Sequence, residues 1–507
     1  MVMRIIRVVL IIILLMPVIC GGQTESPIKS VRGTWINFGY MDERNKYMNP
    51  MGIDITSPEL WRLKVKELSE MGMEYVVIMY VANERKSYYP SYFMQPAYPK
   101  ERESPVEAVL NAADEYNMKV FISTGWAINQ DDDILLEETF DAQLKILRET
   151  AGLYSNHKSF YGWYFPCEGV IAPYLSERHV GITNLLSSEA KRLTPGAKVM
   201  ISPYGLRLVN FSDYTFASQI SKLNVDIIAY QDEIGCVVEA MPLPKMKENF
   251  ARLREIHNTN NIAFWANSEI FTWEKELNVR HSALIPAPFP RFLSQLAGET
   301  KAGVDEIISF SVCGILDKPN SEIPLGHPFY AAKAYTEYMD WKNGIGRWKL
   351  LGATFLGNLR HEAISSQVTN VFPPAVKYSK GNLTDGVLGI ESMNDNNWLG
   401  FEKNDMIATV DLGVIKKIKT IAVRFLNYRL YDIYLPGSVK ISISSDGKNF
   451  QELPTVTMES YTYDNYDCWI DIAMIDADEE ARFIRVFAVN TAKKWIFADE
   501  VMVNPEY

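Results

Sequence analysis

The stretch Ser-Phe-Tyr-Gly-Trp-Tyr-Phe-Pro-Cys-Glu, residues 159–168, decides how the rest of the chain is interpreted. It has the composition of a buried strand, rich in aromatic residues, and it ends on one carboxylate, Glu168. A strand interior is apolar, so the charge belongs where the strand meets solvent. In a (β/α)8 barrel, that end of the strands is where active sites lie. The stretch therefore predicts a barrel strand with Glu168 at the active face.

The flanking sequence supplies the other strands. Apolar runs at 31–38, 74–80, 118–124, 198–203, 225–230, 262–267 and 306–313 alternate with amphipathic helical segments. Ser57-Pro58 and Ser104-Pro105 are typical helix starts, with serine as the cap and proline in the first turn. Eight such units predict an α/β fold, a (β/α)8 TIM barrel, over residues 30–345. The alternative, an open doubly wound sheet, usually carries a glycine-rich loop after its first strand, and Gly39-Tyr40 begins no such loop.

The pattern changes at about Gly346, where helical periodicity ends. Short alternating stretches follow, separated by Gly, Asn and Asp, and Ser445-Asp446-Gly447 is a hairpin turn signal. Residues 346–507 are therefore predicted to form an all-β sandwich.

Composition and the N-terminus restrict the function further. The chain has 507 residues, 47% of them hydrophobic, which is typical of a globular protein. A net charge of −11 without a basic stripe argues against a nucleic-acid partner. Residues 1–20 carry Arg4 and Arg7 before an apolar run that ends at Cys20, which indicates an export signal. The position of Cys20 favours a lipoprotein acylated there, with simple cleavage as the alternative, and this lipid would be the one membrane contact.

Two carboxylates at strand ends suggest the chemistry. Glu168 follows the fourth strand and Glu269 the seventh, and glycoside hydrolysis needs two such groups. We expect Glu168 to be the general acid/base, since apolar neighbours raise a carboxyl pKa, and Glu269 to be the nucleophile of a retaining reaction. The alternative is a salt bridge from these glutamates to a loop arginine such as Arg85 or Arg207.

Further residues near the strand ends are candidates for substrate binding. Asp232 and Glu233 are reserve carboxylates that could orient hydroxyl groups or replace Glu269. Aromatic side chains could stack on sugars, with core packing as the alternative; the candidates are Trp35, Trp126, Tyr204, Tyr230 and Trp265. No His and carboxylate spacing in the barrel indicates a metal, so we expect no catalytic cofactor.

The barrel half resembles a family assigned as secreted glycoside hydrolases of uncharacterised substrate, common in glycan-degrading Gram-negative bacteria. The matching motifs are Gly33-Thr34-Trp35, Tyr88-Tyr89-Pro90-Ser91 and residues 160–164 with Glu168. The resemblance implies a carbohydrate substrate and a location in the periplasm or on the cell surface. In related retaining barrels an asparagine usually precedes the acid/base, whereas this chain has Cys167.

The C-terminal half resembles discoidin-like modules, also called coagulation factor V/VIII C-type domains, which have a galactose-binding-like jelly roll. The motifs lie at 382–386, 397–401, 408–413, 444–450 and 481–486. The resemblance implies glycan binding, with Trp398, Trp469 and Trp495 at the rim, and a structural calcium held by Asp385 and Glu500. The expected function is glycan hydrolysis with an appended binding module. The alternatives are a non-catalytic surface glycan-binding protein and an adhesin that uses mainly the sandwich.

Overall fold

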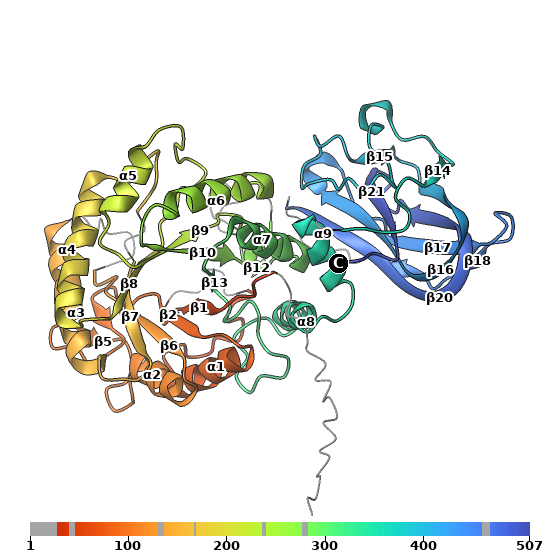
Figure 1. The fold of residues 1–507 in the computed structure, drawn as a ribbon. Helices are drawn as coiled ribbons and strands as arrows, with labels where there is room; N and C mark the ends of the chain where they lie inside the picture. The colour runs from red at the N-terminus through yellow and green to blue at the C-terminus, as the bar shows by residue number, and fades with distance from the viewer. Residues whose placement is uncertain are drawn as a thin grey trace, which may run out of the picture.

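The computed structural model describes residues 28–39, 46–128, 136–166, 169–235, 240–275, 282–357, 359–458 and 467–507. A helix-ringed barrel lies beside a domain made of strands (Figure 1). The predicted signal segment and Cys20 lie outside the described residues. Among the helices that are described, none combines the length and the apolar character needed to cross a membrane.

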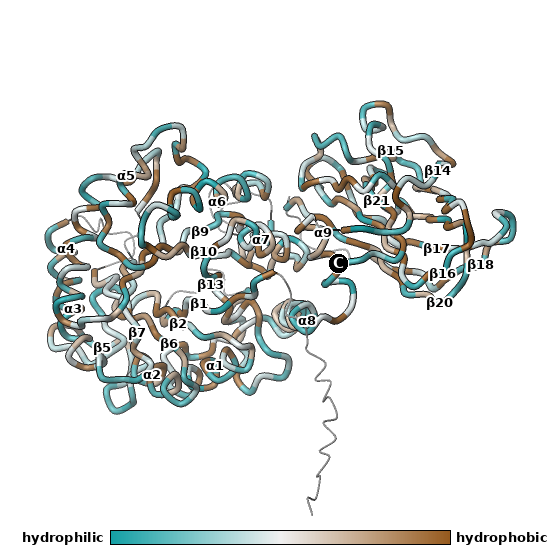
Figure 2. Tube along the Cα trace, in the orientation of Figure 1, coloured by the Kyte–Doolittle hydropathy of each residue, from teal (hydrophilic) through white to brown (hydrophobic). Residues whose placement is uncertain are grey.

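Eight parallel strands close into a barrel in the order β1-β13-β10-β9-β8-β7-β6-β2, which confirms the predicted (β/α)8 fold. The middle of each strand is mostly apolar, as expected where helices cover the outside and side chains fill the inside, and the polar residues lie mainly near the strand ends (Figure 2). Their bounds are β1 Gly33–Ile36, β2 Tyr75–Ile78, β6 Lys119–Ser123, β7 Phe160–Phe165, β8 Lys198–Ile201, β9 Ile227–Gln231, β10 Ala263–Glu269 and β13 Glu306–Phe310.

The helices of the barrel begin where the sequence places their caps. Ser57 accepts a hydrogen bond from the Leu60 amide, and Ser104 accepts one from Glu107, so two otherwise unpaired N–H groups are satisfied. The helices are α1 Pro58–Glu70, α2 Pro105–Glu115, α3 Glu137–Tyr154, α4 Glu177–Leu193, α5 Thr215–Lys222, α6 Leu243–His257, α7 Phe289–Ala302 and α8 Tyr330–Lys342. Loop strands are β3 Ala82–Asn83, β4 Lys86–Ser87, β5 Gln95–Pro96, β11 Phe271–Trp273 and β12 Leu284–Pro286.

The second domain is an antiparallel β sandwich, as predicted. Its strands are β14 Gln367–Asn370, β15 Leu399–Glu402, β16 Met406–Tyr428, β17 Ser438–Ser444, β18 Gln451–Glu452, β19 Val456–Thr457, β20 Cys468–Val489 and β21 Trp495–Val503. The long strands β16 and β20 pair along most of their length and form the centre of the domain. The turn at 445–447 connects β17 to β18, the predicted hairpin.

One helix contradicts the expectation that helical structure ends at Gly346. Helix α9, Trp348–Leu356, lies between the barrel and the sandwich (Figure 1). Its sequence is apolar nearly all round. This composition suits its position, since α7 and α8 pack against it beside the second domain. A helix that is buried on several sides lacks the amphipathic period that reveals surface helices.

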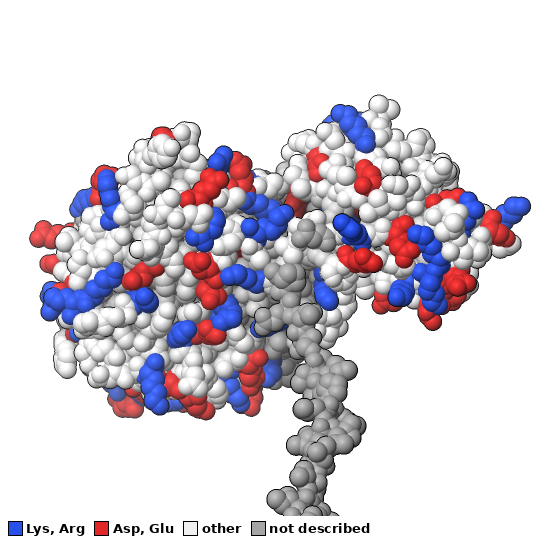
Figure 3. Space-filling view, in the orientation of Figure 1, with Lys and Arg blue, Asp and Glu red and all other residues white. Residues whose placement is uncertain are grey.

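The two domains share one core. Trp341 and Trp348 on the barrel side belong to the same buried apolar cluster as Trp398, Leu426 and Phe497 of the sandwich. Helix α7 is buried on almost every side, since the barrel covers one face and β20 and α9 cover the other. In contrast to this apolar core, the outer surface is charged, and Lys and Arg are interspersed with Asp and Glu on the face shown in Figure 3.

Candidate active site

Glu168, the predicted acid/base, lies outside the described residues together with Cys167. Strand β7, which leads to it, ends at Phe165, and its last four residues are buried in the barrel. The role of Glu168 therefore stays a prediction.

Glu269, the predicted partner, is the last residue of β10 and lies at the carboxyl end of the barrel. Two residues earlier, the Asn267 side chain donates to the Ser202 hydroxyl at 3.2 Å and accepts from the Phe310 amide at 3.0 Å. Alternation along the strand places Glu269 on the same face as Asn267. Glu269 is only 5% exposed, and its Oε2 has no hydrogen-bond partner among the described residues.

The surroundings of Glu269 favour its neutral form. Burial, then the nearby charges of Asp232 and Glu233, raise the pKa of Glu269 well above its ordinary value. Arg291 and the backbone N–H of Gly235 oppose this shift but do not cancel it. A carboxyl group whose pKa is raised keeps its proton to higher pH and can give it to a leaving group.

Asp232 does not face a substrate site. It directly follows β9, is fully buried, and accepts hydrogen bonds from the Glu269 amide at 3.1 Å and from the Gln295 side chain. Burial raises the pKa of Asp232 to about 6. Instead of the predicted substrate-binding role, Asp232 has a structural one: it lies behind β10 and holds the end of that strand in place.

Glu233 is a loop anchor. Its carboxylate accepts backbone N–H bonds from Gly205, Leu206 and Arg207, and the Arg207 guanidinium lies 3.9 Å away. Arg85, the other arginine considered as an alternative partner, pairs with Glu138 at 3.1 Å.

Helix α7 supplies three polar residues that the sequence analysis missed. Arg291 donates to the carbonyls of Glu269 at 3.2 Å and Phe271 at 2.6 Å, and Gln295 donates to the Glu269 carbonyl at 3.1 Å. Glu299 accepts from the Ser268 hydroxyl at 2.7 Å, and burial raises the pKa of Glu299 well above its ordinary range. Their spacing of four residues, which places them on one face of the helix, was the available signal.

Three of the aromatic candidates lie at the carboxyl end of the barrel. Trp35, near the end of β1, packs edge-on against Tyr164 of β7 with ring centroids 5.8 Å apart. Trp126 follows β6 and packs against Tyr80 at 4.9 Å. Tyr204 follows β8 and is half-buried.

Two other barrel candidates lie elsewhere. Tyr230 points outward between β9 and α6, where its hydroxyl contacts His257 Nε2 at 3.0 Å. Trp265 points inward but near the start of β10, where it packs against Tyr75 at 4.9 Å and so fills the opposite end of the barrel. Both are core residues, in contrast to the predicted substrate-binding role.

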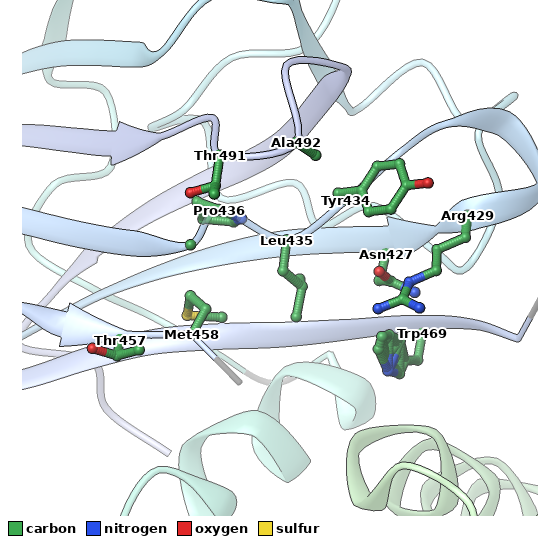
Figure 4. A pocket seen from close by; sticks show the side chains of 11 residues that line it. Asn427, Arg429, Tyr434, Leu435, Pro436, Thr457, Met458, Trp469, Thr491 and Ala492 are labelled. Carbon is green, nitrogen blue, oxygen red and sulfur yellow. The ribbon is translucent and has the colours of Figure 1, made fainter. Parts of the chain in front are cut away.

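The sandwich carries a pocket of about 370 Å³ beside the barrel. Asn427, Arg429 and Trp469 lie at one end, and Thr457 and Met458 at the other (Figure 4). Trp469 also packs with Tyr47, Ala283 and Ile285 from loops of the barrel. Trp398, by contrast, is fully buried and donates its indole N–H to the Ile390 carbonyl at 3.0 Å, so it is a core residue and not a ligand contact.

The predicted calcium ligands lie close together in the sandwich. Glu500 is buried, and its Oε1 accepts from the Gly386 amide at 3.1 Å and lies 2.8 Å from His361 Nε2. Its Oε2 has no hydrogen-bond partner among the described residues, and the charge of exposed Asp385 acts on it. Calcium prefers oxygen ligands, which these two carboxylates offer, but the described residues contain no group of three or more His, Cys, Asp or Glu that could hold a metal ion. Calcium binding therefore stays a prediction.

Solved structures resemble the chain mainly in its fold. A protein described as a "putative alpha-L-fucosidase" from Bacteroides thetaiotaomicron is 18% identical with a TM-score of 0.51, covering 68% of this chain and 100% of its own. A second such protein from the same organism is 11% identical with a TM-score of 0.34, covering 94% and 97%. A Clostridium perfringens module in complex with GalNAc-β-1,3-galactose is 14% identical with a TM-score of 0.21, covering 27% and 94%.

The first of these structures supports the barrel fold, and the other two are too distant to carry an argument. The comparison with curated proteins gave no match. Residues 31–323, more than half of the chain and nearly the whole barrel, match a family described as a domain of unknown function, DUF4434. The chain therefore belongs to the DUF4434 family.

Proposed function

We propose that the chain is a glycoside hydrolase that cleaves a poly- or oligosaccharide at the carboxyl end of the barrel. The observation that carries the proposal is Glu269, a buried carboxyl group at a barrel strand end with one oxygen unpartnered among the described residues. Such a group with a raised pKa is what protonation of a glycosidic oxygen requires. The fold relationship to a protein described as a fucosidase is compatible with this reaction but does not identify the sugar.

We assign the proton donor differently from the sequence-based expectation. Glu269 has the raised pKa, so it acts as the general acid, and Glu168 is the carboxylate that attacks the sugar or activates water. Trp35 and Trp126 shape the mouth in which the sugar binds. The sandwich pocket at Trp469, with its Arg, Asn and Thr side chains, holds a further part of the glycan. Export and lipid attachment at Cys20 belong to the same proposal.

The test is hydrolysis of a panel of glycans by the full-length protein. Glu269→Gln and Glu168→Gln should each lower kcat about 10²- to 10⁴-fold, as expected for loss of an acid/base group. Glu255→Gln is the matched control, because Glu255 lies on the exposed surface of α6 and pairs only with Arg252 in the described contacts. Hydrolysis that persists in both the Glu269 and the Glu168 variants would exclude this pair.

The second candidate is a glycan-binding protein without catalysis, and the pocket at Trp469 is the observation that favours it. In that case glycan binding survives both glutamine substitutions, no product appears with the wild type, and Trp469→Ala removes binding. Isothermal titration with each glycan of the panel distinguishes the two candidates.

A further inference from the structure

Arg291 is a buried cation directly behind the end of β10. It is 1% exposed, and its Nη2 donates to the carbonyls of Glu269 and Phe271. Its Nε and Nη1 have no hydrogen-bond partner among the described residues. A buried charge is costly unless an opposite charge compensates it.

The compensating charge comes from the other domain. Asp467, directly before β20, places its Oδ2 3.8 Å from Arg291 Nε, and its side chain is only 14% exposed. A hydrogen bond from Thr272 on β11 fixes the same carboxylate from the barrel side. Asp467 therefore lies at the corner where the chain leaves β10 and enters β11.

We propose that the sandwich domain is a working part of the barrel's site, because Asp467 holds and neutralises the Arg291 cation behind Glu269. Asp467 is a positioning residue in this arrangement, since it acts on Glu269 through Arg291. The catalytic consequence rests on the proposed function, whereas the effect on the ionisation of Glu269 does not.

The sign of the effect follows from the charges that surround Glu269 among the described residues. Asp232 and Glu233 from the segment after β9 favour its neutral form, Arg291 opposes them, and the charge of Asp232 also acts on Glu299 of α7. Asp467 weakens the influence of Arg291. Its removal leaves the cation uncompensated, so Glu269 should release its proton at a lower pH.

The experiment is an infrared titration of the full-length protein. The carboxyl band of Glu269 is identified as the band that Glu269→Gln removes. Asp467→Asn should move its midpoint to lower pH, because the charge of Arg291 is then no longer compensated. Arg291→Gln should move the midpoint up, and Asp467→Asn added to Arg291→Gln should have little further effect.

Asp471→Asn is the matched control. Asp471 is a fully buried interface aspartate on β20, but it pairs with Arg347 at 3.2 Å and not with Arg291. It should lower stability and leave the Glu269 midpoint in place. If Asp467→Asn fails to fold, Thr272→Val is the second variant. It removes the hydrogen bond from Thr272 to Asp467 but keeps the charge of Asp467, so the Glu269 midpoint should shift down by a smaller amount.

The proposal is overturned if Glu269 titrates as in the wild type after loss of Asp467. It is also overturned if Asp471→Asn gives the same shift, or if the shift persists without Arg291. Failure to find any hydrolysed glycan would remove the proposed function and leave this result standing. Where hydrolysis is found, the loss of kcat at high pH should move with the infrared midpoint.

Discussion

At the scale of single residues, the mouth of the barrel depends on one carboxyl group whose neutral form is favoured. Burial together with Asp232 and Glu233 outweighs the attraction of Arg291, so Glu269 keeps its proton to a higher pH than a surface glutamate. The same residue in water would be ionised at neutral pH and unable to act as an acid.

This ionisation predicts the direction of the pH dependence of hydrolysis. A general acid is active while protonated, so kcat should fall as the pH rises through the raised pKa of Glu269. The measurement is kcat against pH with a glycan that the wild type cleaves. A rate that rises steadily across the same range would instead make Glu269 the nucleophile.

Asp232 predicts a second pH effect, on stability. Its pKa is raised by burial to about 6 in the folded protein, so folding takes up a proton between the ordinary pKa of an aspartate and about pH 6. The free energy of unfolding should therefore fall over that interval as the pH rises, by about 2–3 kcal/mol, and then level off with respect to this group.

Asp232→Asn should flatten this slope, because asparagine does not take up the proton. Its side-chain oxygen can still accept hydrogen bonds from the Glu269 and Ile234 amides, so the local structure is kept. Urea unfolding at a series of pH values from 4 to 7 measures the slope for both proteins. An unchanged slope in the variant would assign the proton uptake to Glu269 or Glu299 instead.

The sequence could not show at which end of the barrel, or on which face of a strand, each aromatic residue lies. Trp35 and Trp265 both lie in apolar strands, yet one lies near the end of β1 and the other near the start of β10. Tyr230 faces outward although its strand is buried on both sides. Where both faces of a strand are apolar, hydrophobic alternation cannot show which face a residue occupies.

At the scale of elements, the barrel strands and the capped helices could be predicted because their signals are local. Ser57 and Ser104 precede prolines, and each caps its helix as expected. Helix α9 was missed because it packs against α7 and α8 and is buried on several sides, so it lacks the polar face that a local pattern would show. The polar residues of α7 were missed because their partners, on β10 and in the loop after β9, are distant from them in the sequence.

Strand β21 contains Glu500, one of the two predicted calcium ligands. Glu500 and Asp385 offer carboxylate oxygens, and a bound ion stabilises the folded state according to its concentration relative to Kd. At a hundredfold excess over Kd, calcium should add about 2.7 kcal/mol to the free energy of unfolding, and a chelator should remove it.

Glu500→Gln should make stability insensitive to calcium. Differential scanning calorimetry with calcium, with magnesium and with chelator gives the comparison. Equal unfolding temperatures of the wild type in all three would show that Glu500 is instead held by His361 and the Gly386 amide without a metal.

At the scale of the whole molecule, the shared apolar core predicts that the two domains unfold together. The interface also contains Glu391, which is almost fully buried and accepts from Lys247 at 3.0 Å and from Ser294. Calorimetry of the full-length protein should show one transition. Glu391→Gln should lower the free energy of unfolding by about 1–3 kcal/mol, because charged hydrogen bonds across the interface are lost.

Two well-separated transitions in the wild type would contradict this prediction and make the sandwich an independent module. Lys245→Gln serves as the control, since Lys245 lies near Lys247 on α6 but pairs with exposed Glu248. This variant should change stability by less than about 0.5 kcal/mol.

The common core of the two domains has a consequence for the glycan. In enzymes with flexible linkers, a binding module samples many distances from the catalytic site, so glycans of many lengths can reach both. Here Trp469 packs against loops of the barrel itself, which fixes the spacing between the sandwich pocket and the mouth. A glycan that occupies both places must match that spacing, so the protein would select glycans by their length as well as by their sugar.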